Sequence, residues 1–375
     1  MEEERKELTL QEEGSGKKPV NKKALTIAAV VLAVLIAAGL VLFFVLRPAA
    51  PEAPQEEAGE EQEVIPETEE YDPGEILSTE PLPESAFVKS ATLGDYDYDL
   101  YEDYAVITKY RLNASEVTIP ETLEDKPVMA IGKNAFSSKS LLSSVTLPSS
   151  TREIGEFAFG NCTSLTAVTL PASVHALGDY AFSGCTSLSE VSMTTGVKSI
   201  GLHAFDAAPY LESGEGDFLI VGDGILIAYR GVGGSIAVPT GVRKIVSFSF
   251  CETLTDLYIP QGVTEIGSFA FAGCTNLASL ILPDTVTAIG ESAFSACDML
   301  TELRLNEGLT SVGDSLFQFC GNLHKVSFPA SLDAIGDNLF DGVETLEAIY
   351  VTPGTFAEQF FAATEYAPLI ISEEA

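Results

Sequence analysis

Apolar and polar residues alternate in short runs through most of the chain from about residue 90 onward. Runs such as Val145-Thr146-Leu147 end at a proline and are followed by the pattern I-G-x-x-A-F-x-x-C-x-x-L. Alternation with a period of two predicts a strand that turns Val145 and Leu147 inward and Thr146 outward. Proline then ends the strand where the chain turns.

The glycine-centred pattern recurs along the chain at a fixed spacing. In two blocks of four copies the glycines lie 23 residues apart, and a degenerate copy at Ile245-Val246 separates the blocks. The eight glycines are Gly132, Gly155, Gly178, Gly201, Gly267, Gly290, Gly313 and Gly336. A coil of this length cannot bury its apolar face alone, but stacked coils bury a continuous core, so the period predicts a repeat solenoid.

The pattern also predicts the course of one coil. We expect the repeat glycine to adopt a backbone conformation that is costly for other residues. The A-F-x-x-C-x-x-L segment fits a short helical turn on the far side, with Phe, Cys and Leu pointing inward. The predicted fold class is therefore an α/β repeat solenoid, rich in strands and with short helical turns.

One long apolar segment precedes the repeats. Residues 24–46 contain 23 residues without a charge, enough to cross the hydrocarbon layer of about 30 Å as a helix. A signal peptide has a shorter apolar region, of about 7–15 residues. We therefore predict one retained transmembrane helix, and the RPAAPEA sequence behind it leaves cleavage as the alternative. Four lysines precede the helix and only Arg47 closely follows it, which predicts a cytoplasmic N-terminus and an extracellular repeat region in the cell membrane.

The segments on either side of residues 24–46 are strongly polar. Residues 1–23 carry six acidic and six basic residues and are predicted to be a disordered cytoplasmic tail. Residues 47–85 are predicted to form an extended extracellular stalk, because positions 48–85 hold 13 acidic residues, seven prolines and no lysine or arginine. An acidic ion-binding tail is the alternative interpretation.

The nine copies resemble the BspA-type leucine-rich repeat of bacterial surface proteins, over roughly residues 95–352. The resemblance implies a leucine-rich-repeat solenoid on a cell-surface protein that functions in adhesion or protein binding. It also implies the domain organisation, with a cap hairpin at Tyr98–Ile119 and a capping helix at Phe356–Tyr366. The predicted parts are residues 86–130 as cap hairpin and first coil, 131–352 as solenoid with a hairpin insertion near 210–238, and 353–375 as capping helix and tail.

Composition argues against several classes of function. The formal net charge of −35 makes nucleic acid a poor partner. No H-E-x-x-H, G-x-S-x-G or phosphate-binding glycine loop is present. The three histidines, His175, His203 and His324, fall at unrelated repeat positions, the first two in positions that usually hold variable surface residues. We predict no catalytic residues, no cofactor and no enzymatic activity.

Cysteines and aspartates offer two candidate chemistries. The six cysteines, at positions 162, 185, 251, 274, 297 and 320, all occupy one repeat position. Stacked neighbours would direct their Cβ atoms in parallel, which favours buried thiols over disulfides. Asp95, Asp97 and Asp99 match the opening of a calcium loop, but Leu100 and Val106 stand where the loop needs glycine and glutamate. An exposed strand edge fits these residues better than calcium, and we predict no metal site.

The outward residues of the strands define the candidate binding surface. They are small in the first half of the solenoid, whereas the second half presents Tyr258, Ile281, Arg304 and Tyr350, with Asp256, Glu302 and Lys325 in the adjacent column. Tyrosine and arginine are enriched in binding hot spots. We predict a protein or glycan partner for this face, and ordinary surface variation is the alternative. The alternative function is a structural spacer or envelope component without a discrete ligand.

Overall fold

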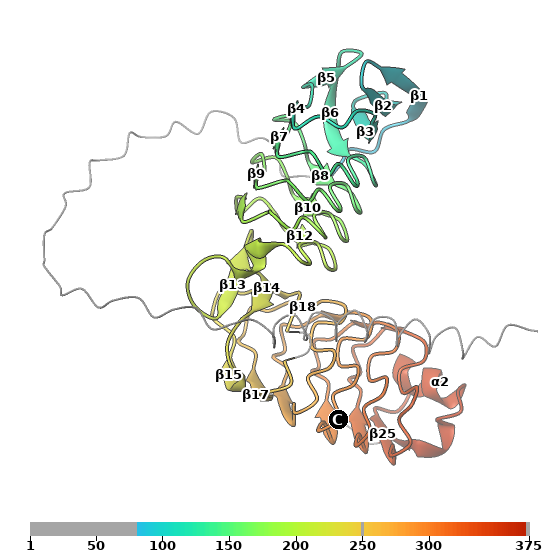
Figure 1. Cartoon of the computed structure of the whole chain (residues 1–375). Coiled ribbons are helices and arrows are strands. Elements are labelled where there is room, and N and C mark those ends of the chain that lie inside the picture. Colours follow the sequence, from blue (N-terminus) through green and yellow to red (C-terminus); the bar gives the residue numbers. More distant parts are fainter. Residues whose placement is uncertain (1–80, 249–250, 373–375) are drawn as a thin grey trace, which may run out of the picture. The chain divides into compact units, whose positions relative to one another are not determined.

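The computed structural model describes residues 81–248 and 251–372, which form stacked coils of short strands and turns (Figure 1). The predicted cytoplasmic tail, the predicted transmembrane helix and most of the predicted stalk lie outside the described residues. Within the described ranges, no helix combines the length and apolar character needed to cross a membrane.

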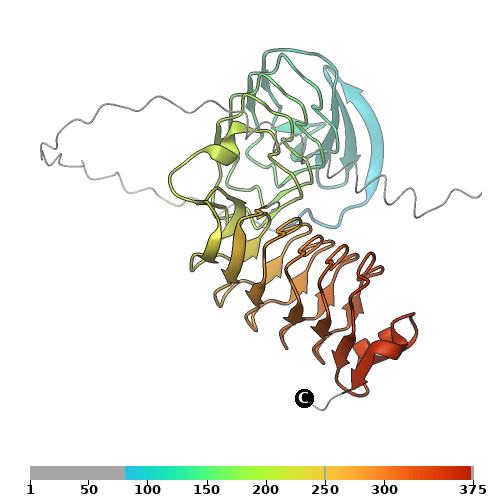
Figure 2. The same ribbon diagram turned by 60° about the horizontal axis from the view of Figure 1, so that its bottom comes forward.

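The first strand of each coil joins a column of parallel strands. Its central residue is usually buried and its neighbours exposed, as at Val168 between Ala167 and Thr169, because alternate side chains point to opposite faces. The strands lie side by side along one edge of the coils (Figure 2). They are β4 (Glu116–Thr118), β7 (Ser144–Thr146), β9 (Ala167–Thr169), β11 (Glu190–Ser192), β15 (Gly234–Ala237), β17 (Leu254–Tyr258), β19 (Ser279–Ile281), β21 (Glu302–Arg304), β23 (Lys325–Ser327) and β25 (Ala348–Val351).

A second strand per coil precedes the repeat glycine and pairs in parallel with its counterparts. Two runs of this pairing occur, β6-β8-β10-β12 and β14-β16-β18-β20-β22-β24. The strands are β6 (Lys126–Ile131), β8 (Glu153–Ile154), β10 (Ala176–Leu177), β12 (Ser199–Ile200), β14 (Ile225–Tyr229), β16 (Lys244–Ile245), β18 (Glu265–Ile266), β20 (Ala288–Ile289), β22 (Ser311–Val312) and β24 (Ala334–Ile335).

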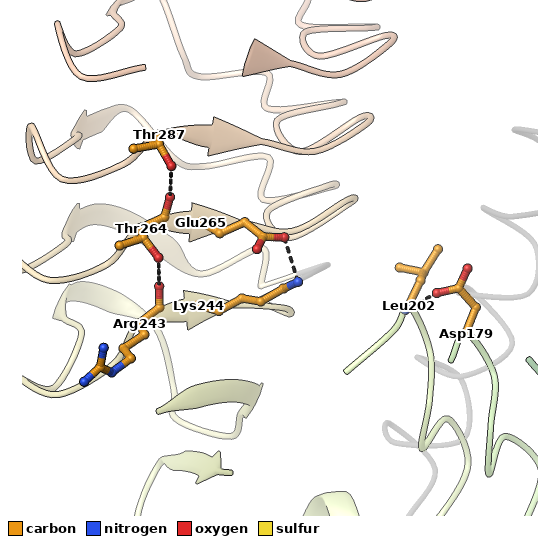
Figure 3. Close-up of polar contacts among 7 residues, drawn as sticks. All are labelled: Asp179, Leu202, Arg243, Lys244, Thr264, Glu265 and Thr287. Carbon is orange, nitrogen blue, oxygen red and sulfur yellow. Dashed lines mark hydrogen bonds and ion pairs between the residues drawn. The ribbon is translucent and has the colours of Figure 1, made fainter. Parts of the chain in front are cut away.

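Polar contacts between equivalent positions also join neighbouring coils (Figure 3). Thr264 Oγ1 donates to the carbonyl of Arg243 at 3.2 Å, and Thr287 Oγ1 donates to the carbonyl of Thr264 at 3.2 Å. Lys244 Nζ lies 2.6 Å from a carboxylate oxygen of Glu265. In the first block the amide of Leu202 donates to Asp179 Oδ1 at 2.7 Å. Each coil thus bonds to the coils next to it, as expected for a solenoid.

The prediction of short helical turns is wrong. The A-F-x-x-C-x-x-L segments are irregular turns, and the helices in the described residues are α2 (Phe356–Ala362) and the 3-10 turns η1 (Pro209–Glu212) and η2 (Ala367–Leu369). In the eight copies that contain the glycine, the residues two and six positions after it have a positive φ, as at Ser315 (56°) and Phe319 (62°). Left-handed residues at this spacing cannot belong to a right-handed helix, so the segment folds as linked turns.

The prediction for the repeat glycines is also wrong, because none of the eight has a positive φ. These glycines are required by the close approach of neighbouring coils. A Cβ on Gly313 would lie 2.4 Å from the backbone nitrogen of Glu291, and one on Gly178 would lie 2.6 Å from that of Glu156. This repeat position therefore requires glycine because no side chain fits there. Close approach of two backbones is the second common reason for a glycine.

Aromatic rings fill the centre of the coils. The phenylalanine of each repeat is buried, and within each block the rings of neighbouring coils stack. Ring centroids are 5.6 Å apart between Phe271 and Phe294 and 6.1 Å apart between Phe294 and Phe317. The first block has an equivalent ladder from Phe136 to Phe205. These rings bury large apolar areas and are the main packing element of each core.

The N-terminal end is covered by antiparallel strands. β1 (Phe87–Leu93), β2 (Tyr96–Tyr101) and β3 (Ala105–Tyr110) pair in order, and β3 then pairs in parallel with β6, which also holds β5 (Thr122–Leu123). The predicted cap hairpin is thus part of a three-stranded meander. Asp97 and Asp99 lie on the interior strand β2, so the expectation of a strand edge is wrong, and β1 forms the edge.

A short helix, α2, covers the C-terminal end. Thr355 caps α2 by accepting from the amide of Glu358. Phe361 is buried on the last coil, with its ring centroid 4.8 Å from that of Phe328. The chain then forms β26 (Ile370–Ser372), which pairs in parallel with β25. The helix and the strand together cover the apolar end that a terminal repeat would otherwise expose.

A hairpin lies between the two blocks. β13 (Phe218–Val221) and β14 are antiparallel around the turn Gly222-Asp223-Gly224, in which both glycines have positive φ. β14 also pairs in parallel with β16. One arm of the hairpin therefore serves as the second strand of a coil.

Candidate binding face

The candidate site begins on two neighbouring strands of the second block. Tyr258 on β17 and Ile281 on β19 are directly opposite each other in the parallel register. Both point away from the core, with 57% of Tyr258 and 67% of Ile281 exposed. Their neighbours Leu257 and Leu280 point inward and are buried. Tyr258 and Ile281 therefore face outward at the centre of the candidate surface.

Arg304 lies on the next coil but belongs to a different sheet. β19 ends the sheet β15-β17-β19, and β21 begins the sheet β21-β23-β25-β26. The interruption coincides with the coil in which Asn306 replaces the usual proline and donates from its side chain to the carbonyl of Val286 at 2.7 Å. The Arg304 guanidinium is exposed and lies 3.7 Å from a carboxylate oxygen of Glu307. An ion pair so exposed holds the arginine weakly and leaves it available to a partner.

The rest of the predicted column continues toward the C-terminal cap. Ser327 lies opposite Arg304 and Tyr350 opposite Ser327, and both are half-buried. Ile371 of β26 lies opposite Tyr350 and is 39% exposed. The sequence interpretation missed Ile371 because it placed residues 353–375 in a helix and tail. The apolar run Leu369-Ile370-Ile371 is the signal that predicts a further strand.

The adjacent column carries charges of both signs. Glu302 lies opposite Lys325 on the neighbouring strand, which places unlike charges side by side. Asp256 is exposed and accepts a hydrogen bond from the hydroxyl of Thr255 at 2.9 Å. The exposed pair Tyr258–Ile281 is thus bordered by an arginine and by charged side chains of both signs. Such an arrangement can pack against a partner and orient it.

The cysteines are all free thiols, and five of the six are buried, whereas Cys251 is half-buried. Each buried thiol donates to a phenylalanine carbonyl of the preceding coil, at sulfur–oxygen distances of 3.0–3.3 Å. Burial raises the pKa of Cys274 and Cys320 to about 12 and that of Cys297 well above its usual value. A neutral thiol is a poor nucleophile and a poor metal ligand, so this ladder is part of the core.

We expect six thiols to react with an alkylating reagent when the protein is denatured without reductant. In the native protein only Cys251 should react at a measurable rate, because the other five are buried and out of reach of the reagent. Mass spectrometry of alkylated peptides measures both results, and Cys251→Ser is the control that should abolish native labelling. Two or fewer reactive thiols after denaturation would show that disulfides have formed.

The aspartates considered for calcium bond to neighbouring strands. Asp97 Oδ1 accepts from the hydroxyl of Thr92 at 2.7 Å, and Asp99 Oδ1 accepts from that of Ser90 at 2.5 Å. Beside them Tyr98 donates to Glu124, and this hydrogen bond, together with burial, raises the pKa of Tyr98 to about 12. Residues 81–248 and 251–372 contain no cluster of three potential metal ligands.

The histidines lie in separate environments. His175 is nearly buried, and its Nε2 atom lies 3.5 Å from Oε1 of Glu153. The expectation of a surface position is therefore wrong for this residue. His203 stacks on Tyr180 with ring centroids 5.3 Å apart and lies 2.6 Å from Asp206. These contacts are separate from the candidate face, and they do not bring two histidines together.

Comparison with known proteins identifies the repeat. The sequence matches the BspA type leucine rich repeat region, in six copies, over residues 108–215 and 235–365. No curated protein matches the sequence significantly.

Similar solved structures come from several bacteria. A leucine rich cell surface protein from Faecalibacterium prausnitzii is 24% identical, with a TM-score of 0.37, over 72% of this chain and 96% of that chain. The pneumococcal vaccine antigen PcpA is 18% identical, with a TM-score of 0.40, over 76% and 99%. A leucine-rich repeat protein from Bacteroides ovatus is 22% identical, with a TM-score of 0.32, over 76% and 100%. The family match covers more than half of the sequence, and the chain belongs to the BspA type leucine rich repeat family.

Proposed function

We propose that the chain is a membrane-anchored cell-surface protein that binds a protein partner through the first-strand face of its second block. Residues 24–46 are proposed as the anchor, with the repeats outside the cell. Membership of a family of surface proteins supports this location. The proposal includes no catalysis.

The observation that carries the proposal is the exposed pair Tyr258–Ile281. Two large side chains at neighbouring positions present more apolar area than the threonines and serine of the first block, Thr118, Thr146, Thr169 and Ser192. Burying apolar area at an interface is favourable by about 25 cal/mol per Å². Tyr258 adds a hydroxyl and Arg304 a guanidinium, the groups most often found in hot spots. A glycan partner is less well supported, because the second tyrosine of the column, Tyr350, is half-buried and four coils away.

Replacing Tyr258, Ile281 and Arg304 together by serine should weaken partner binding by about 100-fold or more, because hot-spot side chains each contribute about 2 kcal/mol or more. The partner is first captured with the full-length protein in detergent from envelope and host-surface fractions. Its affinity is then measured for the wild-type protein and the triple variant.

A control variant replaces Thr118, Thr146 and Thr169 by serine on the same face of the first block. It should bind as tightly as the wild-type protein. Unchanged affinity of the triple variant would refute the assignment of the face, and failure to retain any partner from either fraction would favour a structural spacer.

A further inference from the structure

The second block contains very few basic residues. Residues 251–372 hold 16 aspartates and glutamates but only two residues of the lysine and arginine type, Arg304 and Lys325. Both lie in first strands, Arg304 on β21 and Lys325 on β23. None of the other first strands that the structure describes, from β4 to β25, contains a lysine or an arginine. The lysine and arginine charge of this segment is therefore collected at one place on the candidate face.

The strand register makes the two cations neighbours. β21 and β23 are parallel, Glu302 lies opposite Lys325, and Arg304 follows two residues after Glu302. The middle residue of each strand is buried, so Arg304 and Lys325 both point outward on the same face. They are diagonal neighbours, with Cα atoms about 8 Å apart for strands spaced by about 4.8 Å with a rise of about 3.3 Å per residue. Side chains of this length can reach a common point between the two strands.

The carboxylates around the two cations leave both of them available. The Arg304 side chain is 77% exposed, and its ion pair with Glu307, at 3.7 Å, is long. An exposed pair of this kind is weak. Lys325 lies opposite Glu302 but forms no ion pair with it or with any other described residue. A partner group that binds between the two cations therefore breaks no strong contact.

The two cations border the exposed pair Tyr258–Ile281. Ile281 and Arg304 hold the same position in consecutive coils, which are joined by the pairing of β20 with β22. The point between Arg304 and Lys325 lies about 5–10 Å from Ile281 along the solenoid, because neighbouring strands are about 4.8 Å apart. Two or three residues of an extended segment span this distance at about 3.3 Å per residue. One partner segment can therefore contact the apolar pair and both cations.

The remaining charge of the block limits how acidic this segment can be. The field of the 16 carboxylates reaches about 8 Å at physiological salt and repels a run of acidic residues. A single carboxylate between an arginine and a lysine gains charge-assisted hydrogen bonds, which are stronger than those between neutral groups. The surface therefore favours one carboxylate in an otherwise neutral or basic segment.

We propose that the first-strand face of the second block recognises a partner segment that carries one large apolar residue and one carboxylate, two or three residues apart. The apolar residue packs on Tyr258 and Ile281, and the carboxylate binds between Arg304 and Lys325. The carboxylate fixes the position of the segment on the face, because charged contacts contribute more to specificity than to affinity. This inference rests on the proposed function and adds Lys325 and the chemistry of the partner to it.

Panning a phage library of random peptides on the full-length protein in detergent tests the proposal. The wild-type protein should select peptides in which an aspartate or glutamate lies two or three residues from a large apolar residue, and it should select no runs of acidic residues. The variant Arg304→Gln, Lys325→Gln should select the same apolar residues without the acidic one. The matched control Arg243→Gln, Lys244→Gln removes the same charge at β16, outside the first strands, and should select as the wild-type protein does.

The affinity of one selected peptide measures the contact directly. Replacing its acidic residue by the corresponding amide should weaken binding to the wild-type protein at least tenfold, because a hydrogen-bonded charge pair is lost. The same replacement should weaken binding to the variant Arg304→Gln, Lys325→Gln less than twofold. Fluorescence anisotropy measures the four affinities, and thermal unfolding checks that each variant is folded.

The possible negative results separate this inference from the proposed function. Peptides that require Tyr258 and Ile281 but bind equally well with the amide would overturn the carboxylate site and leave the proposed function intact. Peptides that bind the variant Tyr258→Ser, Ile281→Ser unchanged would count against both. Failure to select any peptide would overturn the inference, whereas a folded partner captured as described above would still support the proposed function.

Discussion

Replacing Gly313 by alanine should destabilise the second block by at least about 3 kcal/mol, at the upper end of the range for an extra methyl group in a packed core. The added Cβ would lie 2.4 Å from the backbone nitrogen of Glu291 and 2.7 Å from the carbonyl carbon of Gly290. Backbone atoms of the preceding coil cannot rotate away as a side chain can. The amide of Gly313 also donates to the carbonyl of Ile289 at 2.8 Å, which holds the two coils at this separation. A lower urea midpoint measured by circular dichroism would report the loss.

Two other glycines serve as matched controls for Gly313→Ala. A Cβ on Gly267, at the same repeat position, would lie 3.1 Å from the carbonyl oxygen of Ile245, so Gly267→Ala should cost less. Gly94 has a φ of 58° with nothing within 4 Å, and Gly94→Ala should cost only about 1–2 kcal/mol of backbone strain. Equal losses for Gly313→Ala and Gly94→Ala would show that coil separation is not what requires the repeat glycine.

The glycines also show what the sequence could and could not predict about the fold. The alternation of apolar and polar residues predicted the strands, because it has a period of two, as at Val145 and Thr146, and recurs in every copy. Spacing could not distinguish a glycine needed for its φ from one needed for its small size. Positive φ falls instead on the residues two and six positions later, which are asparagine or glycine in some copies, as at Asn134 and Gly184, but serine and phenylalanine at Ser315 and Phe319. Because no single residue type marks these positions, the linked turns were taken for a helix.

The candidate face and the hairpin also differ in how far the sequence could predict them. The outward column at Tyr258 and Ile281 followed from register, which a repeat sequence predicts well. The place of the hairpin in the fold could not be predicted from the turn residues Gly222-Asp223-Gly224, because they do not say which column the hairpin joins. Only the pairing of β14 with β16 shows that the hairpin supplies a second strand. An insertion within a repeat thus predicts an irregularity, and tertiary pairing decides which column it joins.

Replacing Phe294 by alanine should destabilise the second block by about 3–5 kcal/mol. The side chain is fully buried between Phe271 and Phe317, at centroid distances of 5.6 Å and 6.1 Å. Removal of the ring loses its burial and its stacking on both sides, and the coils cannot close the cavity because their backbones are hydrogen bonded to each other. Phe356, which is 43% exposed on α2, provides the control. Phe356→Ala should cost less than about 1 kcal/mol, since exposed side chains contribute little.

The place in the fold at which Phe294→Ala lowers stability is as informative as the size of the loss. In a solenoid each coil contacts only its neighbours, so Phe294→Ala should speed amide exchange first in the coils that contain Phe271, Phe294 and Phe317. The first block has a separate aromatic ladder, from Phe136 to Phe205, and its exchange should change little. The double variant Phe271→Ala, Phe294→Ala should lose less than the sum of the single losses, because the two rings share one contact. A uniform rise in exchange across both blocks would instead show that the blocks unfold as one cooperative unit, because stability lost at one coil would then be transmitted through the hairpin to the first block.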